Sequence, residues 1–110
     1  MDLREEILGI DDIVIKPLPV PEWKRTIFIR TIEGGVRDEF EAITQTNPRD
    51  FRARMAVACV CDEQGKLLFT NADIPALTKK SGRALDRIFA AGIKLNAITK
   101  DDVDELRKNF

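Results

Sequence analysis

Residues 12–32 decide the fold class, and they read DIVIKPLPVPEWKRTIFIRTI. β-Branched residues dominate the first part, while Pro17 and Pro19 exclude a helix and confine any strand to a sheet edge, because proline has no N–H to donate. The alternation in residues 26–32 predicts a second strand, and the connection of residues 21–25 is long enough for an antiparallel hairpin. Since two strands alone are marginally stable, one face of this hairpin must be covered by helices or by another subunit.

Helices are predicted for most of the chain that follows the hairpin. Apolar residues recur at i, i+4 and i+7 within residues 36–46, the spacing of an amphipathic helix. A second helix is predicted over residues 49–61, with Asn47 as its N-cap and Pro48 in its first turn. The second half of this helix, Met55–Cys61, is apolar on every side. Such a segment is typical of the central helix of a small domain, and equally of a helix in an interface.

The next stretch alternates turn and cap signals. Residues 62–65 predict a turn, since Asp and Gly favour the required backbone conformations. Asp73 is expected to cap a short helix that follows it, and Ser81 to cap the longest helix of the chain. Phe89 stands in the middle of the apolar stripe of that longest helix and is expected in the core. Gly92 costs roughly 1 kcal/mol relative to alanine within a helix, which indicates a close crossing with another helix.

Short helices are also predicted at both ends of the chain. One covers residues 2–8 and ends at Gly9, and an isolated helix of that length is marginal in water, so we expect a mobile end. The other begins at Thr99. The whole pattern predicts one α+β domain over residues 1–110, with an N-terminal β-hairpin packed against a small bundle of about four helices.

Composition limits the classes of partner. The 110 residues include 44% hydrophobic ones, enough for a core, and the 18 basic side chains nearly balance the 19 acidic ones. This balance argues against a nucleic-acid partner, because such binding relies on basic side chains that neutralise phosphates. No apolar run approaches the roughly 20 residues that span a bilayer. The mixed-charge N-terminus lacks the apolar stretch of a signal peptide, so we expect a cytoplasmic protein.

Catalytic and metal-binding residues are scarce in this sequence. The chain has no His, and its two cysteines, Cys59 and Cys61, would point to opposite sides of a helix, so we expect buried, reduced thiols and no metal site. A calcium loop counted from Asp62 fails on spacing, because Gly65 comes fourth rather than sixth. The acidic residues from Asp101 onward suit a solvated helix face better than a tuned catalytic carboxylate. We therefore expect no enzyme activity, no catalytic residues and no cofactor.

Several short segments form an ordered set along the chain. They are Pro21-Glu22-Trp23, Ile29-Arg30-Thr31, the turn and apolar run of residues 60–69, and the Leu95-Asn96-Ala97-Ile98-Thr99 junction before a final acidic helix. In this order and spacing they resemble the tail assembly chaperones of long-tailed bacteriophages. The resemblance covers about residues 10–109. It implies a non-enzymatic protein in the bacterial cytoplasm that keeps the tape-measure protein soluble until the tail tube polymerises around it, with the tail-tube protein as a further possible partner.

The expected partner-binding residues are apolar. Trp23 lies on the hairpin connection, where it is either a lid over the core or an exposed anchor, and tryptophan is frequent among interface hot spots. The full set is Trp23, Phe28, Met55, Val57 and Val60. We also expect a homo-oligomer, formed by helix packing or by pairing of a free strand edge at residues 26–32. The alternative function is a regulatory or structural adaptor protein of a mobile element.

Overall fold

The structure, a computed structural model, describes residues 2–97. In chain order its elements are α1 (Leu3–Leu8), β1 (Ile15–Val20), the 3-10 turn η1 (Pro21–Trp23), β2 (Arg25–Arg30), α2 (Gly34–Thr46), α3 (Phe51–Cys59), β3 (Val60–Cys61), the 3-10 turn η2 (Asn71–Asp73), α4 (Ile74–Leu77) and α5 (Gly82–Leu95). The α+β fold with a hairpin before the helices is confirmed. The helix expected from Thr99 onward lies outside the described residues.

The sheet is antiparallel, with strand order β1-β2-β3. β1 pairs with β2 in a register that runs from Ile15 opposite Arg30 to Val20 opposite Arg25. β1 lies at the edge, as its prolines predict. β2 is the middle strand, because β3 pairs with Phe28 and Ile29 on its other side. The expected free edge at residues 26–32 is therefore already occupied at these two residues.

The expected helix of residues 49–61 is shorter than predicted, and this is a correction. α3 ends at Cys59, and Val60 adopts extended angles of φ −75° and ψ 128°. Val60 and Cys61 then form β3, which is fully buried. Their extended backbone can pair with β2, a tertiary contact that overrides the local helical pattern. Consequently Cys59 and Cys61 lie on different elements, although both are buried and free as expected.

The predicted turn after β3 is confirmed. Asp62 Oδ1 accepts hydrogen bonds from the backbone N–H groups of Gln64 at 2.8 Å and Lys66 at 3.0 Å. Gly65 has a φ of +87°, and a Cβ there would lie 2.8 Å from Ile15 Cδ1. Glycine is needed both for the backbone angle and for the close approach of β1.

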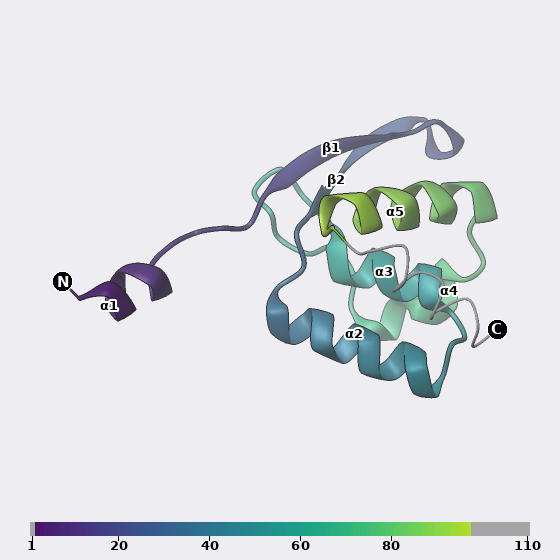
Figure 1. The fold of residues 1–110 in the computed structure, drawn as a ribbon. Coiled ribbons are helices and arrows are strands. Elements are labelled where there is room, and N and C mark those ends of the chain that lie inside the picture. The colour runs from purple at the N-terminus through teal and green to yellow at the C-terminus, as the bar shows by residue number, and fades with distance from the viewer. Residues whose placement is uncertain (1, 98–110) are drawn as a thin grey trace.

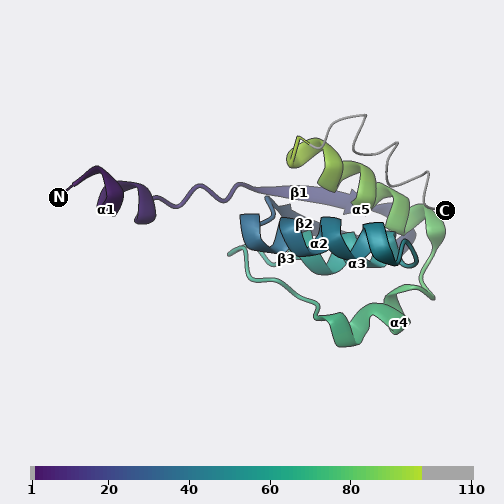
Figure 2. The ribbon, with the colours of Figure 1, turned by 60° about the horizontal axis from the view of Figure 1, so that its bottom comes forward.

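Helices of the same chain cover the hairpin. α5 packs against β1 and β2, and α3 packs against α5 (Figure 1). α2 and α4 contact α3 and complete the helical layer, as the turned view in Figure 2 shows. Among the core side chains, Val20, Met55 and Ile88 are fully buried. The requirement that something cover the hairpin is therefore met without a second subunit.

Two expectations for α5 have different outcomes. The close crossing at Gly92 is confirmed, since a Cβ there would lie 2.8 Å from Met55 Sδ of α3. Phe89, expected in the core, is only half-buried. Its ring meets Phe51 edge-on with a centroid distance of 4.8 Å, at the margin of the α3–α5 contact. The apolar stripe of α5 is wider than the surface that α3 and the sheet cover.

The helix caps were predicted with mixed success. Ser81 Oγ accepts a hydrogen bond from Ala84 N–H at the start of α5, as expected. Asn47 does not cap α3, which begins after Asp50 in a left-handed conformation with φ 64°. Asp73 occupies the N-cap position of α4, as expected, but its side chain makes no capping hydrogen bond to that helix. Its carboxylate instead accepts from the Thr70 N–H at 2.8 Å and forms a capping box around η2, since a 3-10 turn precedes α4 without a break.

The N-terminal segment stands apart from the rest of the chain. The expected first helix is present as α1, capped by Asp2, and none of its residues is buried. Both ribbon views show it at the end of an extended stretch that leads away from the body (Figures 1 and 2). The segment joins the body at Val14, whose N–H donates to Thr31 Oγ1 and whose carbonyl accepts from Thr31 N–H. We call residues 2–14 the arm.

Candidate functional site: an apolar groove beside α3

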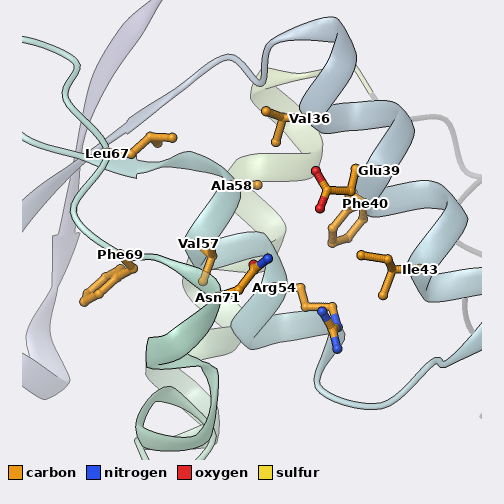
Figure 3. Close-up of a pocket in the computed structure, with 10 residues that line it drawn as sticks. All are labelled: Val36, Glu39, Phe40, Ile43, Arg54, Val57, Ala58, Leu67, Phe69 and Asn71. Carbon is orange, nitrogen blue, oxygen red and sulfur yellow. The ribbon is translucent and has the colours of Figure 1, made fainter.

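A groove of about 220 Å³ lies between α2, α3 and the segment that follows β3. Ten side chains line it: Val36, Glu39, Phe40 and Ile43 of α2, Arg54, Val57 and Ala58 of α3, and Leu67, Phe69 and Asn71 of the following segment (Figure 3). Seven of the ten are apolar. We call this cavity the α2–α3 groove.

The groove follows from how α2 and α3 use their faces. The predicted stripe of α2, Val36, Phe40 and Ile43, turns toward α3, but only Phe40 is buried, and the other two are half-buried. α3 directs Met55 toward α5, as the close approach to Gly92 shows, and this leaves the Val57 side of the helix for the groove. Apolar surface that helix packing does not fully cover is thus concentrated at one place.

Two charged side chains of the groove come from different helices. Glu39 belongs to α2 and is exposed, and Arg54 belongs to α3 and is partly buried (Figure 3). Arg54 Nε is buried and has no hydrogen-bond partner within residues 2–97. A buried donor without a partner is uncommon, because it loses its hydrogen bonds to water without replacement. Arg54 is thus a groove residue whose Nε lacks a hydrogen-bond acceptor within residues 2–97.

A second pocket, of about 320 Å³, adjoins Trp23. Its lining comes from the hairpin connection, η2 and the region of α4: Trp23, Arg25, Phe69, Asp73, Ala76, Leu77 and Lys80. Trp23 is half-buried and packs against the core cluster, so it covers the core on one side and lines this pocket on the other. Phe69 lines both this pocket and the α2–α3 groove.

The five expected partner-binding residues are not brought together. Val57 lines the α2–α3 groove and Trp23 the second pocket. Phe28 is half-buried and lies on the opposite face of the sheet from its buried neighbour Ile29, because successive side chains of a strand alternate. Met55 and Val60 are fully buried in the core and offer no surface to a partner in this structure.

Of the ten groove residues, the sequence analysis selected only Val57 as a partner-binding residue. The stripe of α2 was recognised as helical, but its position was undefined until α3 was placed. Phe69 belongs to an apolar run after the predicted turn, which is the signal that could have marked it. Arg54 could not be found from sequence, since an unpaired buried nitrogen is visible only in the folded chain.

Both cysteines, Cys59 and Cys61, are buried. Burial raises the pKa of the Cys59 thiol to about 12, with a smaller contribution from Cys61. Burial likewise raises the pKa of the Cys61 thiol. Because the thiolate is the nucleophile, both thiols are poor ones at neutral pH. Within residues 2–97 no group of three or more His, Cys, Asp or Glu side chains is placed to hold a metal ion.

The fold is shared with a solved structure of another protein. The solved structure of the bacteriophage HK97 tail assembly chaperone matches with a TM-score of 0.67 at 15% sequence identity, over 84% of this chain and 91% of that one. At this identity the match shows a shared fold. No protein-family model matches the chain, and no curated protein matches it significantly. No helix of the described residues is both long and apolar enough to cross a membrane.

Proposed function

We propose that this protein is a non-enzymatic tail assembly chaperone of a phage or prophage, acting in the cytoplasm of the bacterial host. It binds the tape-measure protein, and the tail-tube protein is a possible second partner. The observation that carries the proposal is the shared fold with the HK97 chaperone over most of both chains. The ordered sequence segments from Trp23 onward support the same function independently.

The α2–α3 groove is the place where a client segment would bind. A helical stretch of a client would set its apolar side chains against Phe40, Val57 and Phe69, and a carboxylate beside them would pair with Arg54. Each client leucine or isoleucine that becomes fully buried contributes roughly 1.5–3 kcal/mol. A few such contacts bind reversibly, as a chaperone that releases its client requires.

The test is co-expression with the tape-measure protein of the same phage. We expect wild-type chain to keep that protein soluble and to be recovered with it, without added ATP or metal. Ile43→Asp and Val57→Asp should abolish both effects, because each places a charge in the groove. Leu68→Asp is the matched control, since Leu68 lies between two groove residues in sequence but is exposed outside the groove.

Circular dichroism must show that the groove variants remain folded, because both side chains are half-buried. A tape-measure protein that stays insoluble beside the wild-type chain would contradict the proposed function. If the folded groove variants are as active as the wild type, the proposed function stands, but the client binds at a site other than the α2–α3 groove.

A further inference from the structure

The arm carries most of the exposed large apolar side chains of the described chain. There are six of these in residues 2–97, namely Leu3, Ile7, Leu8, Ile10, Val14 and Leu68, and five lie in the arm. Leu3 and Leu8 are each 69% exposed. Exposed apolar residues are normally scattered singly over a protein surface. Five of them in one short segment that contacts little else are therefore unusual.

The helix in the arm has little to stabilise it in isolation. α1 has six residues, and helices shorter than about 12–15 residues are marginal in water without packing of an apolar face. Its cap, in which Asp2 Oδ1 accepts from Glu5 N–H at 2.8 Å, is well formed nonetheless. A capped, amphipathic but unpacked helix is a segment suited to bind another surface.

The charges on α1 flank its apolar stripe on both sides. Leu3 and Ile7 are four residues apart and share a face. At about 100° per residue, Arg4 lies roughly 100° to one side of Leu3, and Glu6 about 60° to the other. The stripe therefore has a basic residue along one border and an acidic residue along the other.

The α2–α3 groove has the complementary arrangement. Glu39 of α2 and Arg54 of α3 both line it, and Phe40 and Ile43 are drawn between these two charged side chains in Figure 3. With Leu3 and Ile7 in the groove, Glu6 would face Arg54 and Arg4 would face Glu39. The Arg54 guanidinium would then gain, after a change in its side-chain angles, the acceptor that its buried Nε lacks within residues 2–97.

We infer that α1 of one copy of this protein binds in the α2–α3 groove of a second copy. A second copy is favoured over the same chain because the arm leads away from its own body in both views (Figures 1 and 2). Reciprocal exchange of arms closes a dimer, and one-way exchange extends into a longer assembly. Free strand edges are not required for this association.

The arm would also regulate access to the groove. A client segment that binds there must displace the arm of the neighbouring copy, so the arm keeps the apolar surface covered until a client arrives. This consequence rests on the proposed function, whereas the contact between arm and groove does not.

Sedimentation velocity over a range of concentrations tests the contact. We expect the wild-type chain to associate as its concentration rises, and Leu3→Asp/Ile7→Asp to remain monomeric at a concentration at least about tenfold higher, equivalent to a loss of about 1.4 kcal/mol. Leu68→Asp is the control that changes an exposed apolar residue outside the arm, and it should associate like the wild type. A wild-type chain that stays monomeric at the highest soluble concentration, or an arm variant that associates equally, would overturn the inference.

Charge reversal tests the proposed pairing itself. Glu6→Arg and Arg54→Glu should each weaken association, and the double variant should restore it, because only a direct pair gives such a rescue. Arg54→Glu could fail to fold. In that case, two measurements still test the contact between the arm and the groove: the association of Leu3→Asp/Ile7→Asp, and the association of Glu6→Arg when it is mixed with the wild type. Co-expression of Leu3→Asp/Ile7→Asp with the tape-measure protein separates the two proposals, since client solubility should survive the loss of self-association.

Discussion

At the residue scale, the packing of the helices depends on Gly92. Met55 of α3 occupies the space that a side chain at this position would need, and Cys59 Sγ lies 3.4 Å from the position of the added Cβ. Gly92 and Met55 thus set the distance between α3 and α5. The same crossing buries the Cys59 thiol. The close packing of α3 and α5 is therefore also the reason that the pKa of this thiol is raised.

We expect Gly92→Ala to lower the free energy of unfolding by about 1 kcal/mol, measured by urea denaturation. Overpacking costs roughly 1–3 kcal/mol, and the higher helix propensity of alanine recovers about 1 kcal/mol of it. Gly82→Ala in the first turn of the same helix is the control, since no atom would contact its Cβ within 4 Å. It should leave stability unchanged or raise it, and a larger loss at Gly82 than at Gly92 would refute this account of the crossing.

The Cys59 thiol predicts a dependence of stability on pH. Its pKa is raised by burial from an ordinary value of 9.0 to about 12. Above pH 9 the unfolded chain loses this proton while the folded chain keeps it, so rising pH favours unfolding. Below pH 9 both states keep the proton and the thiol has no effect. We expect this group to lower the free energy of unfolding by up to about 1.4 kcal/mol per pH unit above pH 9.

Urea denaturation of the wild type and Cys59→Ala across this pH range isolates the contribution, because other groups titrate in both proteins. The variant should be less stable at neutral pH, since it leaves a cavity, but should lose less stability as the pH rises. Parallel curves for the two proteins would show that the thiol does not titrate as described.

At the element scale, the junction from α3 through β3 to the turn joins the helical layer to the sheet. α3 ends where Val60 becomes extended, and β3 pairs with β2 for two residues. The chain then turns at Asp62–Gly65 and continues into residues 67–71, which form one wall of the groove. Leu68 N–H donates to the Val60 carbonyl at 3.1 Å, which fixes the start of the segment that carries Phe69. The position of the groove wall therefore depends on this turn.

Gly65→Ala should lower the free energy of unfolding by about 1–3 kcal/mol, the cost of holding a residue other than glycine in a strained backbone conformation. The contact with Ile15 adds to this cost. Gly35→Ala in the first turn of α2 is the control, because its added Cβ would meet nothing within 4 Å. Thermal or urea unfolding of both variants gives the comparison, and equal stability of the two would argue against a strained turn.

At the scale of the whole molecule, a packed body and an unpacked arm are joined at Val14. The body buries its core between the sheet, α5 and α3, whereas none of the α1 residues is buried. Stability is therefore unevenly distributed along the chain, and local opening free energies should follow burial. The arm can bind elsewhere without disturbing the fold that holds the groove.

Amide hydrogen exchange should show this division. In dilute protein we expect the amides of residues 3–13 to exchange fastest and those of α3 and α5 slowest, since only the latter require opening of the core. At higher concentration, protection should appear in α1 if it docks on a second copy. Strong protection of α1 in protein shown to be monomeric would mean instead that the arm folds onto its own chain.

Local patterns in the sequence determined the hairpin, the helices, the turn at Gly65 and the close crossing at Gly92. Each depends on residues near one another in the chain: prolines that block a central position in the sheet, apolar spacing that matches the helix period, or a glycine with no side chain. The α+β class follows from these elements. The resemblance to tail assembly chaperones also came from the order of short segments, and one solved protein of that kind shares the fold.

Only the tertiary structure decided that Val60 and Cys61 leave the helix to pair with β2, and that β2 is the middle strand. It also decided which residues of the apolar α3 segment are buried, with Met55 inside the core and Val57 in the groove. The groove itself draws on residues 36–43, 54–58 and 67–71, which are separated in the chain. Contacts between such distant segments depend on the relative rotation and spacing of whole helices, and no local periodicity records those quantities.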